Sequence, residues 1–242
     1  MKSRAIVLGA SGGIGQAICR KLAADGWSLY LHYNENAYQA TQLLDELLAE
    51  FPKQDFQTVQ SDFSKPDGGH TLASLTGHIQ AVIVASGQSM LKLLSDTSIE
   101  DMDALWRVHL QNPASFISLV SPSLRSFSVS YIVFISSIWG ETGAAGEVMY
   151  SAIKGAQQAF VKAYAKEAAY TGTRVNAITP GWIETVMNDE LTLEDKQMVV
   201  EQIPLRSTGT PTDVAELVGF LLSGKADYMT GEILKLNGGW HI

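Results

Sequence analysis

Residues 5–15 read AIVLGASGGIG, a short apolar run followed at once by a glycine-rich loop. The run predicts a strand over residues 4–9, and the pattern behind the loop predicts a helix over residues 13–25. Because Gly9, Gly13 and Gly15 lack a Cβ atom, the backbone here turns tightly and approaches a ligand closely. The N–H groups at the start of the helix favour an anion such as a pyrophosphate. The stretch therefore predicts a dinucleotide-binding loop between a strand and a helix.

The glycine spacing is GxxxGxG, which differs from the GxGxxG of the general Rossmann fingerprint. A glycine-rich loop by itself is also compatible with a plain strand-to-helix turn. The strand before the loop and the helix after it favour the nucleotide-binding interpretation.

Apolar β-rich runs and helical patterns alternate along the chain, which is typical of βαβ units that build a parallel sheet. They predict strands at 4–9, 28–33, 55–60, 79–85, 130–136, 173–178 and 232–236, and helices at 13–25, 36–51, 99–125, 148–171, 192–202 and 211–223. The expected fold class is α/β, a three-layer Rossmann-type doubly wound parallel sheet in a single domain over residues 1–242. Residues 182–210 have the weakest pattern and follow Pro180-Gly181, so we expect a loop–helix segment there that covers the substrate.

The composition excludes several classes of protein. No apolar stretch in the 242 residues reaches the roughly 18 residues that span a bilayer, so we expect no membrane insertion. A formal charge of −8 without a run of Lys or Arg argues against nucleic-acid binding. Cys19 is the only cysteine, which excludes an intrachain disulfide, and the five histidines are too scattered to predict a metal site. The N-terminus shows no export signal, so the cytoplasm is the expected location.

Ser137, Tyr150 and Lys154 form the pattern with the clearest chemistry. The four-residue step from Tyr150 to Lys154 puts the phenol and the ammonium on one helical face, and Ser137 lies at the end of the preceding strand. An ammonium favours the phenolate and so lowers the pKa of a neighbouring tyrosine from its usual value of about 10. The three groups together suggest acid catalysis on a carbonyl, although Tyr and Lys also occur at this spacing by chance in amphipathic helices.

Together with these motifs, the sequences RVNAITPG at 174–181, YMTGE at 228–232 and NGG at 237–239 resemble those of the short-chain dehydrogenase/reductase family. The two C-terminal motifs are similar to the 3-oxoacyl-acyl-carrier-protein reductase branch. The resemblance covers essentially the whole chain. It implies an enzyme that transfers hydride between a nicotinamide dinucleotide and a carbonyl group.

The resemblance also implies roles for individual residues. Tyr150 would protonate the carbonyl oxygen, Ser137 would hydrogen-bond that oxygen, and Lys154 would bind the nicotinamide ribose and lower the pKa of Tyr150. His109 falls on the place of the family's fourth catalytic residue, an Asn that holds a relay water through its backbone carbonyl. The His109 side chain either joins that relay near neutral pH or merely fills space in a helix.

The cofactor-binding residues implied by the resemblance are spread over five loops and the catalytic helix. They are Gly9, Ser11, Gly12, Gly13, Ile14, Gly15, Tyr33, Asn34, Asp62, Phe63, Ala85, Ser86, Gly87, Tyr150, Lys154, Pro180, Gly181, Ile183 and Thr185. Asp62 would contact the adenine. The alternative is that Asp62 only caps a loop or stabilises a turn.

The end of the second predicted strand bears on the choice of nucleotide. A carboxylate there would bind both ribose hydroxyls of NAD and repel the 2′-phosphate of NADP, but this chain has Tyr33 at that place. We therefore expect NADPH, with NADP+ as its oxidised form. No Arg or Lys stands at Gly12 or Asn34, where NADP enzymes often have one, and Glu35 adds a negative charge.

The chain departs from the family pattern at positions that bear on the substrate. Residues 84–87 read VASG in place of the common NNAG, so only Gly87 is kept. Ser128 and Thr171 stand where carrier-protein reductases place basic residues that attract an acidic carrier. The negative net charge also weakens the case for such a partner.

By resemblance, the expected function is that of an NADPH-dependent carbonyl reductase whose leading substrate is a 3-oxoacyl thioester. The alternatives are a 5-aminopentanone group on modified elongation factor P and a small diffusible ketone or sugar. A hypothesis of another class is a sensor or scaffold that binds NADPH without turnover. The pocket that decides between substrates would lie beside Trp139, Ala144, Ala145, Trp182 and Met187. The family expectation for assembly is a homotetramer packed through the helices at 99–125 and 148–171.

Overall fold

The computed structural model describes residues 3–185 and 192–242. Its centre is a seven-stranded sheet in the order β3-β2-β1-β4-β5-β6-β7, and every neighbouring pair is parallel. The strands are β1 (Arg4–Leu8), β2 (Ser28–Tyr33), β3 (Phe56–Gln60), β4 (Ala81–Val84), β5 (Ser130–Ile135), β6 (Thr173–Pro180) and β7 (Ile233–Leu236). The α/β fold class is thus the one that the sequence predicts.

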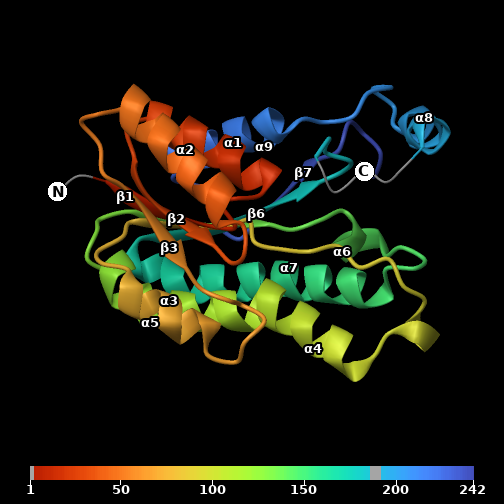
Figure 1. Cartoon of the computed structure of the whole chain (residues 1–242), viewed down its shortest axis with the longest axis horizontal. Coiled ribbons are helices and arrows are strands. Elements are labelled where there is room, and N and C mark those ends of the chain that lie inside the picture. The colour runs from red at the N-terminus through yellow and green to blue at the C-terminus, as the bar shows by residue number, and fades with distance from the viewer. Residues whose placement is uncertain (1–2, 186–191) are drawn as a thin grey trace.

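Helices cover both faces of this sheet, as Figure 1 shows. One layer contains α1 (Gly13–Ala24), α2 (Ala37–Glu50) and α9 (Pro211–Leu222). The other contains α3 (Gly68–Leu75), α4 (Ile99–Trp106), α5 (Asn112–Leu124) and α7 (Val148–Ala168). The short α6 (Trp139–Thr142) and α8 (Leu193–Gln202) lie towards the end where the C-terminus is found, opposite the N-terminus. The described chain also contains η1 (Leu94–Asp96), η2 (Arg107–Gln111) and η3 (Ala169–Thr171).

Two hydrophobic clusters hold the three layers together. Alternate residues of a strand point to opposite faces, so Ala5 and Val7 of β1 join one cluster while Ile6 and Leu8 join the other. The first cluster includes the buried faces of α1, α2 and α9, with Cys19 packed inside it, and the second includes those of α3, α5 and α7. Both faces of the central strands are therefore buried, which explains their continuous apolar sequences.

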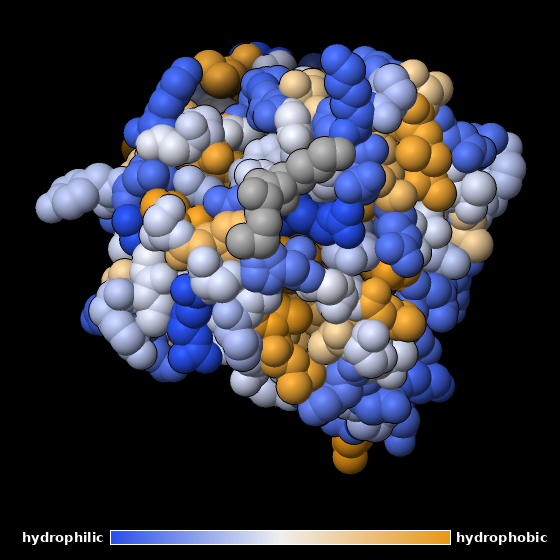
Figure 2. Space-filling view, turned by 90° about the vertical axis from the view of Figure 1, so that its left-hand side faces the viewer, coloured by the Kyte–Doolittle hydropathy of each residue, from blue (hydrophilic) through white to orange (hydrophobic). Residues whose placement is uncertain are grey.

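The exterior is mostly polar. Figure 2 shows hydrophilic side chains over most of one face of the molecule, with smaller apolar patches between them. Within the described residues, no helix is both long and apolar enough to cross a membrane.

The helix predictions are correct except at three places. The helix predicted over 99–125 is split by η2, a π-helical turn, because Arg107–Gln111 form wider turns than an α-helix. The helix α3 was not predicted because it begins with Gly68 and Gly69, which disfavour helix. The short α6 was not predicted either, since its four residues are too few for a periodic pattern.

The two ends of the segment predicted to cover the substrate are joined by backbone hydrogen bonds. Ile183 and Gly209 form an isolated parallel bridge, and the Gly209 N–H donates to the Trp182 carbonyl at 2.9 Å. Helix α8 within the segment begins with a capping box between Thr192 and Asp195. Part of the predicted segment, residues 186–191, lies outside the described residues.

The strand order brings several loops to one edge of the sheet. β1 has β2 on one side and β4 on the other, so the direction in which successive strands are added to the sheet reverses between β1 and β4. In such parallel sheets the crevice at the carboxyl ends of the strands is where ligands bind. The glycine loop after β1, residues 85–88 after β4, and Ser137 after β5 all lie at this edge.

We predict that Gly15→Ala lowers the free energy of unfolding by about 1–3 kcal/mol, because a Cβ atom at this position would overlap the Gly9 carbonyl and force the loop to shift. The matched control is Gly12→Ala, whose Cβ atom would meet the same carbonyl oxygen at 3.5 Å, an ordinary contact. Gly12 is also the N-cap of α1, where alanine is less favourable than glycine, so we expect the control to lose about 0.5–1 kcal/mol, less than Gly15→Ala. Chemical denaturation of both variants measures the difference, and equal losses would contradict this account of the loop.

Candidate active site

The glycine loop is packed directly onto the chain that follows β4. Gly9 has a φ of +82°, and a Cβ atom there would lie 2.7 Å from Ser86 Cα. Gly12 is the N-cap of α1, and as a glycine it leaves the first-turn N–H groups uncovered by a side chain. Ser11 accepts from the Gln16 side chain through its carbonyl at 3.0 Å, and Ile14 packs against the first cluster. This cradle fits a pyrophosphate, because backbone donors and a helix dipole meet where side chains are absent.

His32 connects the glycine loop to the loop after β3. Its Nδ1 accepts from the Gly9 N–H at 3.1 Å, so the proton is on Nε2, which donates to the Ser61 carbonyl at 3.0 Å. The ring lies against Phe63 with centroids 4.6 Å apart. Burial lowers the pKa of His32 to about 4, so the ring is neutral at pH 7. His32 was not predicted as a site residue, and the signal that points to it is its place at the end of β2, one residue before Tyr33.

The other residues predicted for the adenosine end lie on these same loops. Tyr33 ends β2, and the Asn34 carbonyl accepts from the Gln60 side chain at 3.2 Å. Asp62 Oδ1 accepts from the Ser64 N–H at 2.8 Å, which is the turn role given as the alternative for this residue. The Asp62 carboxylate keeps a second oxygen for a ligand. The structure therefore brings Tyr33, Asn34 and Asp62 to the edge that carries the glycine loop.

The loop after β6 closes the site from another side. Pro180 ends β6, and its carbonyl accepts a hydrogen bond from the Ile138 N–H at 3.2 Å. The Gly181 N–H donates to the Leu236 carbonyl at 2.9 Å. A Cβ atom at Gly13 would lie 3.4 Å from Thr185 Cγ2, which places Thr185 beside the glycine loop. The predicted residues 180–185 and the glycine loop thus lie together in space.

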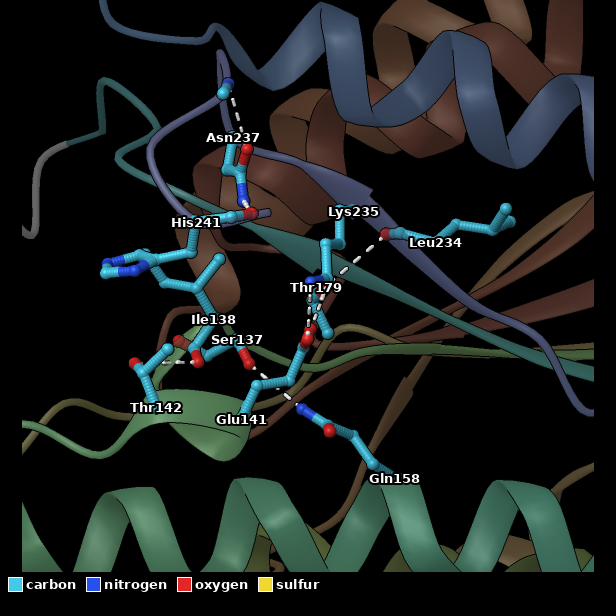
Figure 3. Close-up of polar contacts among 11 residues, drawn as sticks. Ser137, Ile138, Glu141, Thr142, Gln158, Thr179, Leu234, Lys235, Asn237 and His241 are labelled. Atoms are coloured by element: carbon cyan, nitrogen blue, oxygen red, sulfur yellow. Dashed lines mark hydrogen bonds and ion pairs between the residues drawn. The ribbon is translucent and has the colours of Figure 1, made fainter. Parts of the chain in front are cut away.

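Ser137 follows the buried strand β5 and is held by its neighbours. Its Oγ accepts from the Trp139 N–H at 3.2 Å, and its carbonyl accepts from the Gln158 side chain at 3.1 Å. Figure 3 shows the Gln158 contact together with the bond from Thr179 Oγ1 to Glu141, at 3.0 Å, which braces α6 against β6. Only 8% of Ser137 is exposed. The hydroxyl therefore has a fixed place at the carboxyl end of the sheet.

Lys154 lies beneath Tyr150 on α7. Its Nζ is 5.5 Å from the centre of the Tyr150 ring and donates to the Ile135 carbonyl at 3.0 Å. The residue is 3% exposed, and this burial lowers the pKa of Lys154 to about 7. A buried ammonium with a depressed pKa is typical of functional sites.

The pKa of Tyr150 differs from the sequence prediction. It is raised to about 12, because burial and the nearby Glu147 carboxylate disfavour the phenolate more than hydrogen bonding to Ser137 favours it. The expectation of a lowered pKa is therefore wrong for this structure. At neutral pH the Tyr150 phenol keeps its proton, which suits a proton donor.

His109 is buried within the π-helical turn η2, with its ring edge-on to Tyr150. Burial and the charge of Lys154 lower the pKa of His109 to about 3. The ring is therefore neutral near pH 7, which favours the second alternative, a side chain that fills space in the helix. Asn112, three residues further on, binds the Phe63 and Lys65 carbonyls and the Gly69 N–H, which makes it a support for residues 63–69.

A group of aromatic rings stands next to Ser137. Trp139 meets Trp240 edge-on at 5.3 Å and His241 at 5.7 Å between ring centroids. Asn237 Nδ2 donates to the His241 carbonyl at 2.7 Å and so fixes the C-terminal residues, as Figure 3 shows. Trp139 was predicted to line the pocket, whereas Trp240 and His241 were missed, because a single sequence gives no sign that the C-terminus folds back here. Met187, also predicted to line the pocket, lies outside the described residues.

A parallel sheet with a glycine loop at its switch point, next to a Ser–Tyr–Lys set whose serine and lysine are buried, defines the class of nicotinamide-dependent oxidoreductases. A family model described as "Enoyl-(Acyl carrier protein) reductase" matches residues 9–241. The chain belongs to the short-chain dehydrogenase/reductase family. It is an oxidoreductase, and its family uses a nicotinamide cofactor.

Individual relatives agree with this family. The chain is 40% identical over 242 residues to the oxidoreductase YmfI of Bacillus subtilis, with all of both chains covered. It is 30% identical over 246 residues to the 3-oxoacyl-[acyl-carrier-protein] reductase FabG of Staphylococcus epidermidis, again over all of both chains. The solved structure of a blue fluorescent protein from a metagenomic library, in complex with NADPH, matches with a TM-score of 0.92 and 27% identity, covering 99% of this chain and 98% of that chain.

The neutral state of His32 predicts a loss of stability in acid. Its pKa in the folded protein, about 4, is below the unfolded value of 6.5, so its contribution is complete above pH 6.5 and is lost as the pH falls towards 4. Over this range we expect wild-type protein to lose about 3 kcal/mol more than His32→Asn, which keeps an acceptor for Gly9 but does not titrate. Denaturant unfolding at pH 7, 5.5 and 4 measures this difference.

The control for this measurement is His70→Asn, a substitution of an exposed histidine, which should follow the wild-type pH dependence. Parallel curves for wild type and His32→Asn would show that His32 is not the neutral buried group described above.

Proposed function

We propose that this protein is an NADPH-dependent carbonyl reductase in which Ser137, Tyr150 and Lys154 act together on a substrate ketone. The observation that carries the proposal is the convergence of the three side chains. The Tyr150 and Ser137 hydroxyls lie close enough for Ser137 to affect the pKa of Tyr150, and Lys154 is buried with its Nζ 5.5 Å from the centre of the Tyr150 ring. A fold that only bound nucleotide would not need a serine hydroxyl buried beside the Tyr150 phenol. The set therefore argues against the alternative of a non-catalytic NADPH sensor or scaffold.

The cofactor in this proposal is NADPH. The glycine loop would hold its pyrophosphate, Lys154 and Tyr150 its nicotinamide ribose, and Pro180 to Thr185 its nicotinamide end. The end of β2 carries Tyr33 and no carboxylate, which leaves space for a 2′-phosphate. The relative solved with NADPH supports the same choice. When bound, the cofactor supplies the hydride to the carbonyl carbon.

The side chains of this protein then control the proton. Tyr150, protonated at neutral pH, donates its phenolic proton to the carbonyl oxygen as negative charge develops there. Ser137 hydrogen-bonds the same oxygen and holds it in place. Lys154 stabilises the phenolate left on Tyr150, because an ammonium within a few ångströms favours that anion. The aromatic group at Trp139 and the segment over residues 182–210 would cover the substrate and exclude water.

The leading substrate in the proposal is a 3-oxoacyl thioester. The relative FabG, at 30% identity over the full chain, is named as a 3-oxoacyl-[acyl-carrier-protein] reductase and supports this choice. Ser128 and Thr171 offer no positive charge for an acidic carrier, so a thioester on a small carrier fits better than one on an acidic protein.

One observation favours a second candidate, a ketone that carries an amine. Glu147 lies three residues before Tyr150, raises its pKa through its charge, and is ion-paired with no basic side chain within residues 3–185 and 192–242. A carboxylate that is partly buried beside the reacting hydroxyl attracts a cationic substrate and repels an anionic one. The 5-aminopentanone group on elongation factor P belongs to this chemical class. A small neutral ketone is a third candidate, on which Glu147 would have little effect.

For the assembly, we propose a homotetramer in the cytoplasm. A surface groove of about 410 Å³ runs between α5 and α7, the helices expected to pack against symmetry mates. It is lined by apolar residues such as Ile117 and Phe160, with Arg125 and Glu167 of opposite charge at its margin. About a twofold axis the same helices of two copies would face each other, so that Arg125 of one copy could meet Glu167 of the other.

Loss of NADPH absorbance with a panel of ketones tests the function, with Tyr150→Phe as the matched variant. We expect wild-type protein to reduce at least one member of the panel, and the variant to lose at least about a hundredfold in kcat, because it lacks the proton donor. NADPH binding by fluorescence titration should be nearly unchanged in the variant. Survival of activity in Tyr150→Phe would overturn the mechanism.

The same panel decides between the substrates. It contains a 3-oxoacyl thioester with and without its carrier protein, a primary aminoketone, and a neutral ketone of the same length. Glu147→Gln should weaken turnover of the aminoketone and leave the neutral ketone unaffected. A KM for NADH below that for NADPH would reject the proposed cofactor, and no turnover with any ketone would reject the function.

A further inference from the structure

The π-helical turn at Arg107–Gln111 presents one backbone carbonyl to α7. Gln157 Nε2 donates to the His109 carbonyl at 2.6 Å, and both residues are at most 1% exposed. A π-helical turn shifts its carbonyls out of the regular α-helical ladder and is frequently found at functional sites. The family resemblance implies that this carbonyl holds a relay water. In this structure it accepts a hydrogen bond from the Gln157 side chain.

The His109 ring is fixed by the chain that follows β4. Its Nε2 lies 3.0 Å from the Gln88 carbonyl oxygen and 3.2 Å from the Gln88 nitrogen. The ring fits only because residue 87 is glycine, since a Cβ atom at Gly87 would lie 2.7 Å from His109 Cε1. In this chain, therefore, a larger residue at position 87 would displace the His109 ring.

Tyr150 is in contact with the same ring. The His109 and Tyr150 rings meet edge-on, with centroids 5.6 Å apart and an interplanar angle of 88°. Edge-to-face pairs of this kind prefer one relative orientation of the two rings. His109 therefore restricts rotation of the Tyr150 side chain about its own axis.

Gln157 shares its helical face with the reacting residues. Tyr150, Lys154 and Gln157 are spaced i, i+4 and i+7 on α7, so they form one stripe along the helix. The Gln157 amide uses its nitrogen on His109, while its Oε1 and the His109 Nδ1 are buried without a hydrogen-bond partner in the described residues. Buried polar atoms without partners are rare in native proteins and are tolerated where function requires them.

We propose that Gln157 is a positioning residue, which fixes the His109 carbonyl and thereby holds the His109 ring against Tyr150. This inference rests on the proposed reductase function, in which Tyr150 must point its hydroxyl at the substrate oxygen. A small misplacement of a reacting group lowers the rate strongly without weakening substrate binding. Because His109 stays neutral, the pair acts through geometry and carries no proton.

The test uses the variants Gln157→Met and Gln157→Glu, which remove the Gln157 Nε2 donor but keep a side chain of similar size. The Met side chain has no donor for the His109 carbonyl, and the Glu side chain has none once its carboxyl is ionised. We expect kcat per folded enzyme to fall about ten- to a hundredfold, with the KM for NADPH nearly unchanged. Wild-type kcat in both variants would overturn the proposal. The control is Gln54→Leu, which removes two side-chain hydrogen bonds, from Gln54 Nε2 to the carbonyls of Ala23 and Trp27 at 2.8 and 2.7 Å, far along the chain from the site. It should lower stability and leave kcat unchanged.

A double-mutant cycle separates positioning from a merely structural role. If Gln157 acts through His109, the double variant His109→Ala/Gln157→Met loses no more activity than the more damaging single variant. Losses that multiply would show that the two residues act independently and would contradict the proposal.

A spectroscopic measurement keeps the proposal testable without turnover. With ¹³C-labelled tyrosine and Tyr150→Phe for assignment, the two sides of the Tyr150 ring should give separate signals in wild type and averaged signals in Gln157→Met. Averaged signals in wild type would overturn the inference even if ketone reduction is observed. If no ketone is reduced but the wild-type signals are separate, the proposed function fails while the positioning contact stands.

Discussion

The hydrogen bond from Lys154 Nζ to the Ile135 carbonyl joins α7 to the end of β5, and the arrangement of the site depends on it. It is reinforced by the bonds from Ser136 Oγ to the Lys154 carbonyl and from Gln158 to the Ser137 carbonyl, at 3.1 Å each. Close approach of α6 and α7 requires glycine, since a Cβ atom at Gly140 would lie 2.7 Å from the Lys154 backbone. These contacts hold the Tyr150 and Ser137 hydroxyls near each other, and the burial that they require lowers the pKa of Lys154 to about 7. The same contacts therefore determine both the packing of α7 against β5 and the lowered pKa of Lys154.

Two neutral histidines extend this junction to the neighbouring loops. His32 connects the glycine loop to the loop after β3, and His109 connects the loop after β4 to the ring of Tyr150. Burial keeps both rings uncharged at pH 7, so each serves as a fixed donor or acceptor. Because both contact loops at the carboxyl edge of the sheet, they help to fix the positions of the glycine loop and of the Tyr150 ring.

Sequence predicted the sheet well, because continuous apolar runs such as Ala5–Leu8 and Tyr131–Ile135 leave few alternatives to buried parallel strands. It also predicted that Tyr150 and Lys154 share one helical face, since residues four apart on a helix are neighbours. Ser137 was predicted to follow the preceding strand, as it does. It did not predict the raised pKa of Tyr150, which depends on burial and on the charge of Glu147. Nor did it predict Gln157, His32, Trp240 or His241, because their contacts join residues far apart in the chain. The π-helical turn at His109 was missed for a related reason, since it leaves the hydrophobic period almost unchanged.

The central claim is that the junction of β5 and α7 reduces a carbonyl by hydride transfer with Tyr150 as the proton donor. Single-turnover reaction of the protein with a ketone and NADPH that carries deuterium at the reactive carbon of its nicotinamide tests this claim most directly. The account predicts deuterium on the carbinol carbon of the alcohol product, in an amount equal to the NADPH oxidised, with no incorporation at that carbon from water. Oxidation of NADPH without deuterium in an alcohol product, or hydrogen from water at the carbinol carbon, would contradict it.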